Sequence, residues 1–246
     1  MKNDFTNILN KVIEISRNKY DIDVGNNAIY VMEKLFLLSK ENQSISYAEC
    51  GVYKGTTLLP IYHFCNLVFN KFKLFAIDSY AGFPQNIRHD NDDFKRFYDL
   101  HQDSKISIEH LNRAENRYKK LKADEHLTTE YFSNYFDELS ARCKDKNEIK
   151  IIKCDFSDLN EKLFESEYFN IVFLDCDLYQ SYKTCLDFFH DKTSLFVFDE
   201  YYSLKYPGGR IAVDGFISKN VEWQLENKIE HNPYFERWSM IKTNGK

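Results

Sequence analysis

Two acidic side chains, Asp175 and Asp177, stand one residue apart in the stretch Asn170–Tyr179, where an apolar run ends. Successive side chains of a strand alternate between its faces, so we expect both carboxylates on one side and Cys176 on the other. Two anions so close together repel each other unless a positive group lies near them. The pair therefore indicates either a functional site that attracts a cation or a solvated strand end.

Four further β-type runs also end in acidic residues, namely Glu49, Asp78, Asp155 and the pair Asp199–Glu200. Helix-like segments separate the runs. Strands rich in Ile, Val and Phe that alternate with helices indicate an α/β fold with a parallel sheet covered on both faces. Because ligands of such sheets bind beyond the carboxyl ends of the strands, we expect these acids to surround one crevice.

The acids of the fourth and fifth runs predict a metal site. Asp175, Asp199 and Glu200 would form a cluster of hard oxygen donors, which suits Mg²⁺ or Ca²⁺ rather than zinc. Without a metal, three neighbouring carboxylates would raise one another's pKa values.

The first run leads into a glycine turn and then into a helix expected from Thr56 to about Phe69, with Thr56 or Thr57 as its cap. Gly51 and Gly55 would let the backbone approach a ligand closely. Their spacing matches neither a dinucleotide fingerprint nor a phosphate loop. Glu49 beside the turn would repel a pyrophosphate but attract a cation, and S-adenosylmethionine carries an ammonium and a sulfonium without any phosphate.

The second and third runs supply two further candidate ligands. Asp78 could accept hydrogen bonds from ribose hydroxyls, or it could be a turn-forming residue; we favour the ribose role. Asp155 could accept the amino group of an adenine that Phe156 flanks. The competing interpretation is that Ser157 or Asp158 caps a helix beginning near Leu159.

We predict that the whole chain forms one cytoplasmic domain. It has 246 residues and a net charge of −5, without the basic stripe that nucleic-acid binding requires. The start lacks the apolar core of a signal peptide, and no apolar run is long enough to span a bilayer. Six cysteines occur without a CxxC pair, which predicts reduced packing residues rather than disulfides or zinc ligands.

Two helical regions flank the first strands. Residues 1–40 contain helices predicted at 4–20 and 28–38, which would pack on the sheet, over the site or on a second copy in a homodimer. Residues 85–148 form a long, aromatic-rich helical insertion between the second and third strands, of the kind that forms lids or binding walls. Lys228–His231 and Glu236–Lys242 predict a closing hairpin turned at Asn232-Pro233.

Four motifs in order carry a resemblance to a known family. The segments Glu49–Gly55, Asp78–Pro84, Leu174–Ser181 and Asp199–Tyr201, followed by Gly209–Asp214, resemble the macrocin O-methyltransferase (TylF-type) family. These are S-adenosylmethionine-dependent, metal-assisted sugar O-methyltransferases, and the resemblance runs from about residue 28 to the C-terminus. It implies a Rossmann-like class I methyltransferase fold of seven strands with a reversed last strand.

The resemblance also implies roles for individual residues, although Tyr53, Cys176 and Glu200 stand where the family usually has Trp, Gly and Asp. Asp177 matches the general base. The implied metal ligands are Asp175, Asp199 and Glu200, for Mg²⁺ or alternatively Ca²⁺ or Mn²⁺. The implied cofactor-binding residues are Glu49, Gly51, Gly55 and Thr56 at the methionine end, Asp78 and Ser79 at the ribose, Asp155 and Phe156 at the adenine, and Asp175.

The expected acceptor is a hydroxyl of a sugar or glycan, and no nucleic-acid or membrane partner is expected. Two alternatives remain open. One is a methyltransferase of another small diol or catechol-like acceptor, and the other is a catalytically silent interaction protein that keeps the fold.

Overall fold

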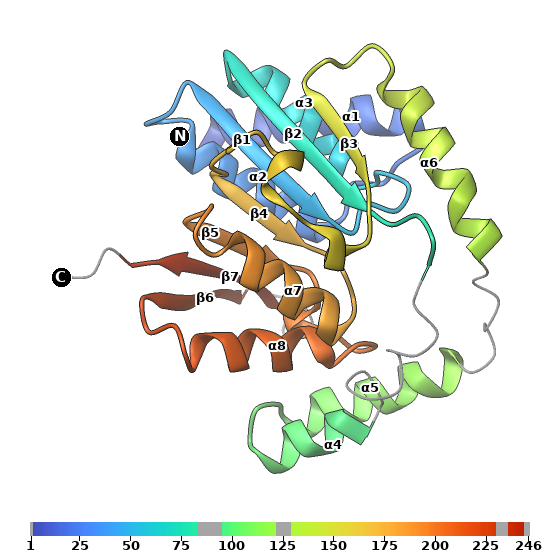
Figure 1. The fold of residues 1–246 in the computed structure, drawn as a ribbon, viewed down its shortest axis with the longest axis vertical. Coiled ribbons are helices and arrows are strands. Elements are labelled where there is room, and N and C mark those ends of the chain that lie inside the picture. The colour runs from blue at the N-terminus through green and yellow to red at the C-terminus, as the bar shows by residue number, and fades with distance from the viewer. Residues whose placement is uncertain (1, 83–94, 122–128, 230–235, 244–246) are drawn as a thin grey trace.

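A computed structural model describes residues 2–82, 95–121, 129–229 and 236–243. Within these residues the chain forms a seven-stranded sheet in the order β3-β2-β1-β4-β5-β7-β6 (Figure 1). Strand β7 runs antiparallel to its neighbours β5 and β6, and the other pairs are parallel. The strands are β1 Ser44–Cys50, β2 Lys71–Asp78, β3 Ile149–Lys153, β4 Ile171–Leu174, β5 Leu195–Phe198, β6 Trp223–Ile229 and β7 Glu236–Lys242.

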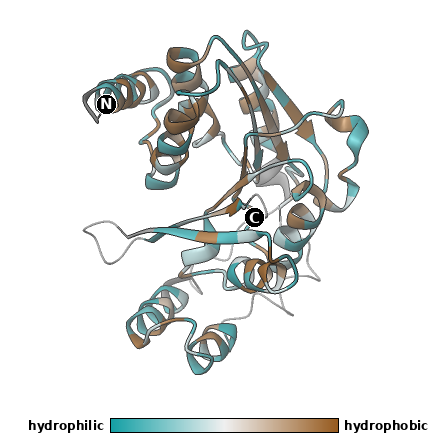
Figure 2. Ribbon diagram, turned by 90° about the vertical axis from the view of Figure 1, so that its left-hand side faces the viewer, coloured by the Kyte–Doolittle hydropathy of each residue, from teal (hydrophilic) through white to brown (hydrophobic). Residues whose placement is uncertain are grey.

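Helices cover both faces of the sheet, as expected, and each face has its own apolar core. The first core packs α1 (Lys2–Tyr20), α2 (Asn26–Leu38) and α3 (Leu58–Val68) against the sheet. The second packs α7 (Tyr179–Phe189) and α8 (Gly208–Ile217) on the opposite face. Figure 2 shows the central strands coloured mainly as hydrophobic, which is typical of strands buried on both faces. Among the described helices, none has the length and apolarity that crossing a membrane requires.

The five predicted parallel strands are confirmed, and several boundaries differ. Helix α2 begins at Asn26 and α3 at Leu58, and β6 begins at Trp223 instead of Lys228 because the Trp223 side chain is buried in the second core. The turn predicted at Asn232-Pro233 lies outside the described residues. The division into a single domain stays a prediction.

The helix predicted near Leu159 is wrong. The chain forms two 3₁₀ turns instead, Phe156–Asp158 and Glu161–Leu163. The side chain of Asp155, rather than that of Ser157 or Asp158, caps the first turn by accepting a hydrogen bond from the Ser157 amide at 2.8 Å. Leu159 then adopts an extended conformation with φ −56° and ψ 127°, which stops the turn from continuing.

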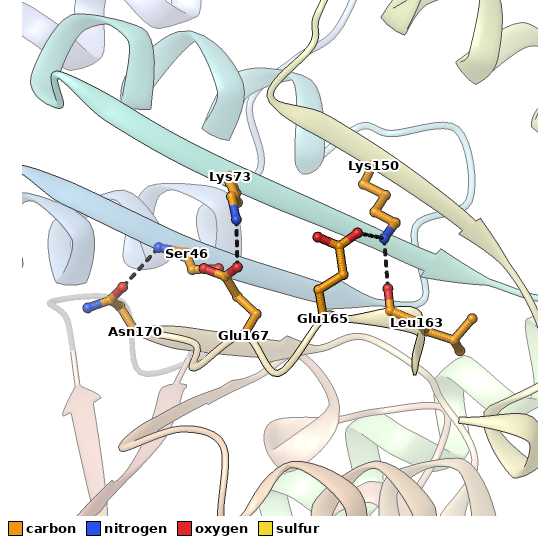
Figure 3. Close-up of polar contacts among 7 residues, drawn as sticks. All are labelled: Ser46, Lys73, Lys150, Leu163, Glu165, Glu167 and Asn170. Atoms are coloured by element: carbon orange, nitrogen blue, oxygen red, sulfur yellow. Dashed lines mark hydrogen bonds and ion pairs between the residues drawn. The ribbon is translucent and has the colours of Figure 1, made fainter. Parts of the chain in front are cut away.

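Polar contacts hold this irregular segment to the sheet where a crossover helix was expected (Figure 3). The Asn170 side chain accepts a hydrogen bond from the Ser46 amide at 2.9 Å, which fixes the start of β4 beside β1. Glu167 pairs with Lys73 of β2 at 2.8 Å, and Lys150 of β3 donates to the Leu163 carbonyl at 2.9 Å. These contacts hold the loop between β3 and β4 on the sheet, and its Phe164 and Phe169 side chains are buried in the second core.

The described part of the insertion is helical, as predicted, and it contacts the chain near the sheet's carboxyl edge at two places. Helices α4 (Lys95–Gln102) and α5 (Ile108–Leu121) share a small core that also packs Leu204 and Ile211, from the chain that follows β5. His110 of α5 contacts the Ser203 carbonyl at 2.7 Å. Helix α6 (Thr129–Cys143) reaches the turn after β1, where Tyr135 packs edge-on against Tyr53. The described helices of the insertion therefore pack on the chain that follows β5 and on the turn that follows β1.

Candidate active site

A cavity of about 610 Å³ opens at the carboxyl ends of β1, β2 and β4. Its volume falls in the range typical of small-molecule sites. Eight of the predicted site residues line it, namely Gly51, Thr56, Asp78, Ser79, Asp155, Phe156, Asp175 and Asp177. Glu49, Gly55, Asp199 and Glu200 are not among the lining residues. Most of the site residues predicted from the sequence therefore surround one crevice.

Asp78 orders the turn between β1 and α3. Its carboxylate accepts hydrogen bonds from the Val52 amide at 2.8 Å, from the Tyr53 amide at 3.0 Å and from the Tyr80 amide at 2.8 Å. A carboxylate offers about four acceptor positions, so these three bonds leave capacity for a ligand hydroxyl. Asp78 therefore acts as a turn-forming residue, and its contact with a ribose stays a prediction.

The two glycines of the turn have packing roles that spacing did not reveal. Gly51 has φ +87°, and a Cβ atom there would lie 1.8 Å from the backbone oxygen of Asp175. Gly55 has φ +75°, and its Cβ position is 2.5 Å from the side chain of Leu139 in α6. Gly51 thus allows β1 to approach the chain after β4, and Gly55 allows α6 to approach the turn. Thr57 occupies the cap position of α3 without a side-chain hydrogen bond.

Glu49 lies behind the cavity wall and is 1% exposed. The Tyr47 hydroxyl donates a hydrogen bond to its carboxylate at 2.8 Å. Burial raises the pKa of Glu49 to about 8 because desolvation disfavours the charged form. The predicted attraction of Glu49 for a cationic ligand would consequently be weakened near neutral pH, and its role at the methionine end stays a prediction.

Strand alternation does not place Asp175, Cys176 and Asp177, because the strand stops before them, although Cys176 is buried in the second core. Strand β4 ends at Leu174, and Asp177 adopts a left-handed conformation with φ +57°. Cys176 lines the cavity together with both acids. Non-glycine residues adopt this conformation rarely, and it concentrates at functional sites. The loop, rather than strand pleating, brings both carboxylates to the cavity.

Asp175, Asp199 and Glu200 come together as predicted, each with a carboxylate oxygen within 4.8 Å of the others. Burial raises the pKa of all three, and for Asp175 and Glu200 the neighbouring negative charges of Asp199 and Asp177 raise it further.

Two residues outside the predicted set hold these carboxylates. The Tyr182 hydroxyl of α7 contacts Glu200 Oε2 at 2.6 Å and accepts a hydrogen bond from the Glu200 amide at 3.1 Å. The side-chain amide of Asn27 donates a hydrogen bond to Asp199. Sequence reasoning missed both, because neither lies in a motif and each is far from its partner along the chain. The one sequence signal for Asn27 was its residue type at the start of a helix, where asparagine is common.

Comparisons with known proteins agree with this architecture. No protein-family model matches the chain, and no curated protein matches it. Among solved structures, the calicheamicin methyltransferase CalS11 is 14% identical with a TM-score of 0.59, covering 99% of this chain and 93% of its own. The O-methyltransferase NovP is 17% identical with a TM-score of 0.58, covering 98% and 100%. The chain has the class I methyltransferase fold. Its resemblance to the macrocin O-methyltransferase family stays a prediction.

Within this class I methyltransferase fold, the acidic cluster fits a divalent cation. Its donors are hard carboxylate oxygens, the kind that Mg²⁺ and Ca²⁺ prefer. Across the described part of the chain no lysine, arginine or histidine forms an ion pair with Asp175, Asp199 or Glu200. A bound cation would therefore relieve the mutual repulsion that raises their pKa values.

Gly209 at the start of α8 packs tightly on this cluster, and its replacement gives a test. A Cβ at Gly209 would lie 2.9 Å from the Cβ of Glu200 and 3.1 Å from the Tyr182 ring. We expect Gly209→Ala to displace Glu200, lowering the free energy of unfolding by about 1–3 kcal/mol and weakening divalent-cation binding.

The matched control is Gly215→Ala in the same helix, where a Cβ would meet nothing within 4 Å. It should stabilise the protein by up to about 1 kcal/mol through helix propensity. Urea unfolding and calorimetric titration of Mg²⁺ measure both variants. If the two variants showed the same free energy of unfolding and the same Mg²⁺ affinity, the packing argument would be contradicted.

Proposed function

We propose that this protein is an S-adenosylmethionine-dependent O-methyltransferase that uses a divalent cation and acts on a sugar hydroxyl. The observation that carries the proposal is the acidic cluster of Asp175, Asp199 and Glu200 beside the cavity, within a class I methyltransferase fold. CalS11 is described as a TDP-rhamnose 3'-O-methyltransferase, at 12% identity and a TM-score of 0.52. That description supports a sugar acceptor.

We assign the following roles to the site residues. The turn held by Asp78 and the residues Asp155 and Phe156 bind the cofactor, whose sulfonium supplies the methyl group. Asp175, Asp199 and Glu200 would hold the cation, preferably Mg²⁺, and a bound cation would supply a Lewis acid that lowers the pKa of the acceptor hydroxyl. Alignment of two reactants in an attack geometry can contribute roughly 7–11 kcal/mol to the acceleration. Asp177, at the cavity wall, accepts the proton that the hydroxyl loses.

A second candidate is methylation of another small diol or catechol-like compound, because two adjacent hydroxyls present the same oxygen pair to the cation. A silent interaction protein is disfavoured, since a decayed site would be expected to lose some of these acids. The net charge of −5 also opposes a nucleic-acid acceptor.

Calorimetric titration of S-adenosylmethionine into metal-stripped protein tests the central claim, with a repeat in Mg²⁺ and with NAD as the control ligand. We expect a dissociation constant of about micromolar order for S-adenosylmethionine and none measurable for NAD. Labelled-methyl assays with sugars and with catechols would then identify the acceptor class. Absence of binding under both metal conditions would overturn the proposal.

A further inference from the structure

Tyr182 is a fully buried side chain whose hydroxyl contacts Glu200 at two points. It packs in the second core. The hydroxyl lies 2.6 Å from Glu200 Oε2 and accepts a hydrogen bond from the Glu200 amide at 3.1 Å. A phenylalanine would fill the same apolar space, and a buried tyrosine hydroxyl is kept where it finds polar partners. The hydroxyl therefore serves Glu200, which is itself 3% exposed.

The elements around Tyr182 direct its hydroxyl to this place. Helix α7 begins just after the loop that follows β4, and the Tyr182 amide bonds to the Leu178 carbonyl at 3.0 Å in the first turn. Helical side chains lean toward the N-terminus of their helix. The ring thus points back to the end of β4, where the hydroxyl lies 2.8 Å from the Leu174 carbonyl oxygen. Leu174 pairs with Phe198 of β5, and Glu200 lies two residues beyond that pair.

The hydroxyl carries one proton, and the Glu200 carboxylate is the stronger acceptor for it. The Leu174 carbonyl already accepts a hydrogen bond from the Asp199 amide at 2.9 Å. When Glu200 is ionised, as binding to a cation requires, Tyr182 donates to its Oε2 and accepts from its amide. Two bonds to one residue restrict the rotation of the glutamate side chain.

Gly209 confines the same glutamate by packing. A Cβ at Gly209 would lie 2.9 Å from the Cβ of Glu200 and 3.1 Å from the Tyr182 ring, so little free space surrounds the glutamate there. The hydrogen bond at Oε2 competes with a cation for that oxygen, and it leaves the other carboxylate oxygen of Glu200 free of Tyr182. Glu200 is therefore held as a ligand that offers one oxygen more readily than two.

We infer that Tyr182 is a positioning residue that makes the cation site formed by Asp175, Asp199 and Glu200 prefer Mg²⁺ to Ca²⁺. The inference rests on the proposed function and specifies its cation. Ca²⁺ takes about six to eight oxygen ligands in flexible arrangements and often uses both oxygens of a glutamate, whereas Mg²⁺ requires near-ideal octahedral geometry. A glutamate that is fixed and offers one oxygen suits Mg²⁺, and a glutamate free to turn suits Ca²⁺.

Calorimetric titration of the two cations tests the inference without requiring turnover. Metal-stripped protein is saturated with S-adenosylhomocysteine, and Mg²⁺ and Ca²⁺ are titrated separately. We expect the unaltered protein to bind Mg²⁺ about ten-fold or more tightly than Ca²⁺. Tyr182→Phe should weaken Mg²⁺ binding about 10- to 100-fold, as is typical when a residue that orients a metal ligand is removed. It should weaken Ca²⁺ binding much less, so that the preference is lost.

The matched control is Tyr30→Phe. Tyr30 is also buried, at 4% exposed, and its hydroxyl contacts the Ser239 hydroxyl at 2.9 Å. It packs in the first core, on the other face of the sheet from Tyr182. Both variants remove one buried hydroxyl from a tyrosine, but only Tyr182 contacts the acidic cluster. Tyr30→Phe should keep both cation affinities of the unaltered protein.

The contrary outcomes are distinct. An unchanged ratio of Mg²⁺ to Ca²⁺ affinity in Tyr182→Phe overturns the inference and leaves the proposed function standing. Equal losses of Mg²⁺ affinity in Tyr182→Phe and Tyr30→Phe also overturn it, because the loss would then follow from any buried hydroxyl. If Tyr182→Phe does not fold, the unaltered protein still decides, since Ca²⁺ binding as tight as Mg²⁺ binding overturns the inference. Binding of S-adenosylhomocysteine without either cation overturns the use of a cation in the proposed function itself.

Discussion

Asp177→Asn should lower methyl-transfer turnover about 10²- to 10⁴-fold, because the variant loses the group that accepts the hydroxyl proton. Its binding of S-adenosylmethionine should stay nearly unchanged. Asparagine suits this position because Asp177 has φ +57°, a conformation that asparagine and aspartate tolerate better than other side chains. An alanine variant would add backbone strain and confuse the result. Single-turnover assays with labelled cofactor measure the effect.

The matched control for this variant is Asp21→Asn. Asp21 also has a left-handed conformation, with φ +56°, but it is exposed in the loop between α1 and α2. Both variants exchange a carboxylate for an amide at the same backbone geometry, so only the location differs. Turnover of Asp177→Asn within a few-fold of the unaltered protein would remove Asp177 as the base and leave the cation as the principal activator of the hydroxyl.

Gly51→Ala should be the most destabilising single substitution in the site, with a loss of about 3–5 kcal/mol in the free energy of unfolding. The added methyl group would lie 1.8 Å from the backbone oxygen of Asp175, where neither partner is a side chain that can rotate away. The φ of +87° adds strain for any residue with a Cβ. Urea denaturation monitored by circular dichroism gives the loss directly.

Gly55→Ala separates the steric clash of the added methyl group from the backbone strain of a positive φ. Gly55 has a similar φ of +75°, but its added methyl group would meet only the end of the Leu139 side chain. We expect a loss of about 1–3 kcal/mol there, since Leu139 can move and the conformational cost remains. If both variants lost the same stability, the close approach of β1 to the chain after β4 would not be what requires glycine at position 51.

The gathering of acids at one edge could be predicted from the sequence because it follows from chain direction alone. Each of β1 to β5 carries its acid in its last residues or just after them, and parallel strands bring these ends to the same edge of the sheet. The cavity lined by Asp78, Asp155 and Asp175 confirms that argument. Hydrophobic periodicity likewise predicted the helices that cover the two faces, although their observed boundaries differ from the predicted ones by one or two residues.

Which residues support the acids was decided by the tertiary structure. Asn27 reaches Asp199 across 172 positions of the chain, and Tyr182 reaches Glu200 across 18, distances at which local patterns carry no information. The Asp175–Asp177 loop also departed from the strand alternation because β4 stops at Leu174.

The amino-acid sequence by itself determined the order of strands and helices and the acidic character of the edge where they end, because hydrophobic periodicity and residue type are local properties. Only the tertiary structure decided that Gly51 faces the backbone of Asp175 and that Glu49 is buried. Those features arise from how closely strands and helices far apart in the chain pack together, and packing depends on the whole fold at once.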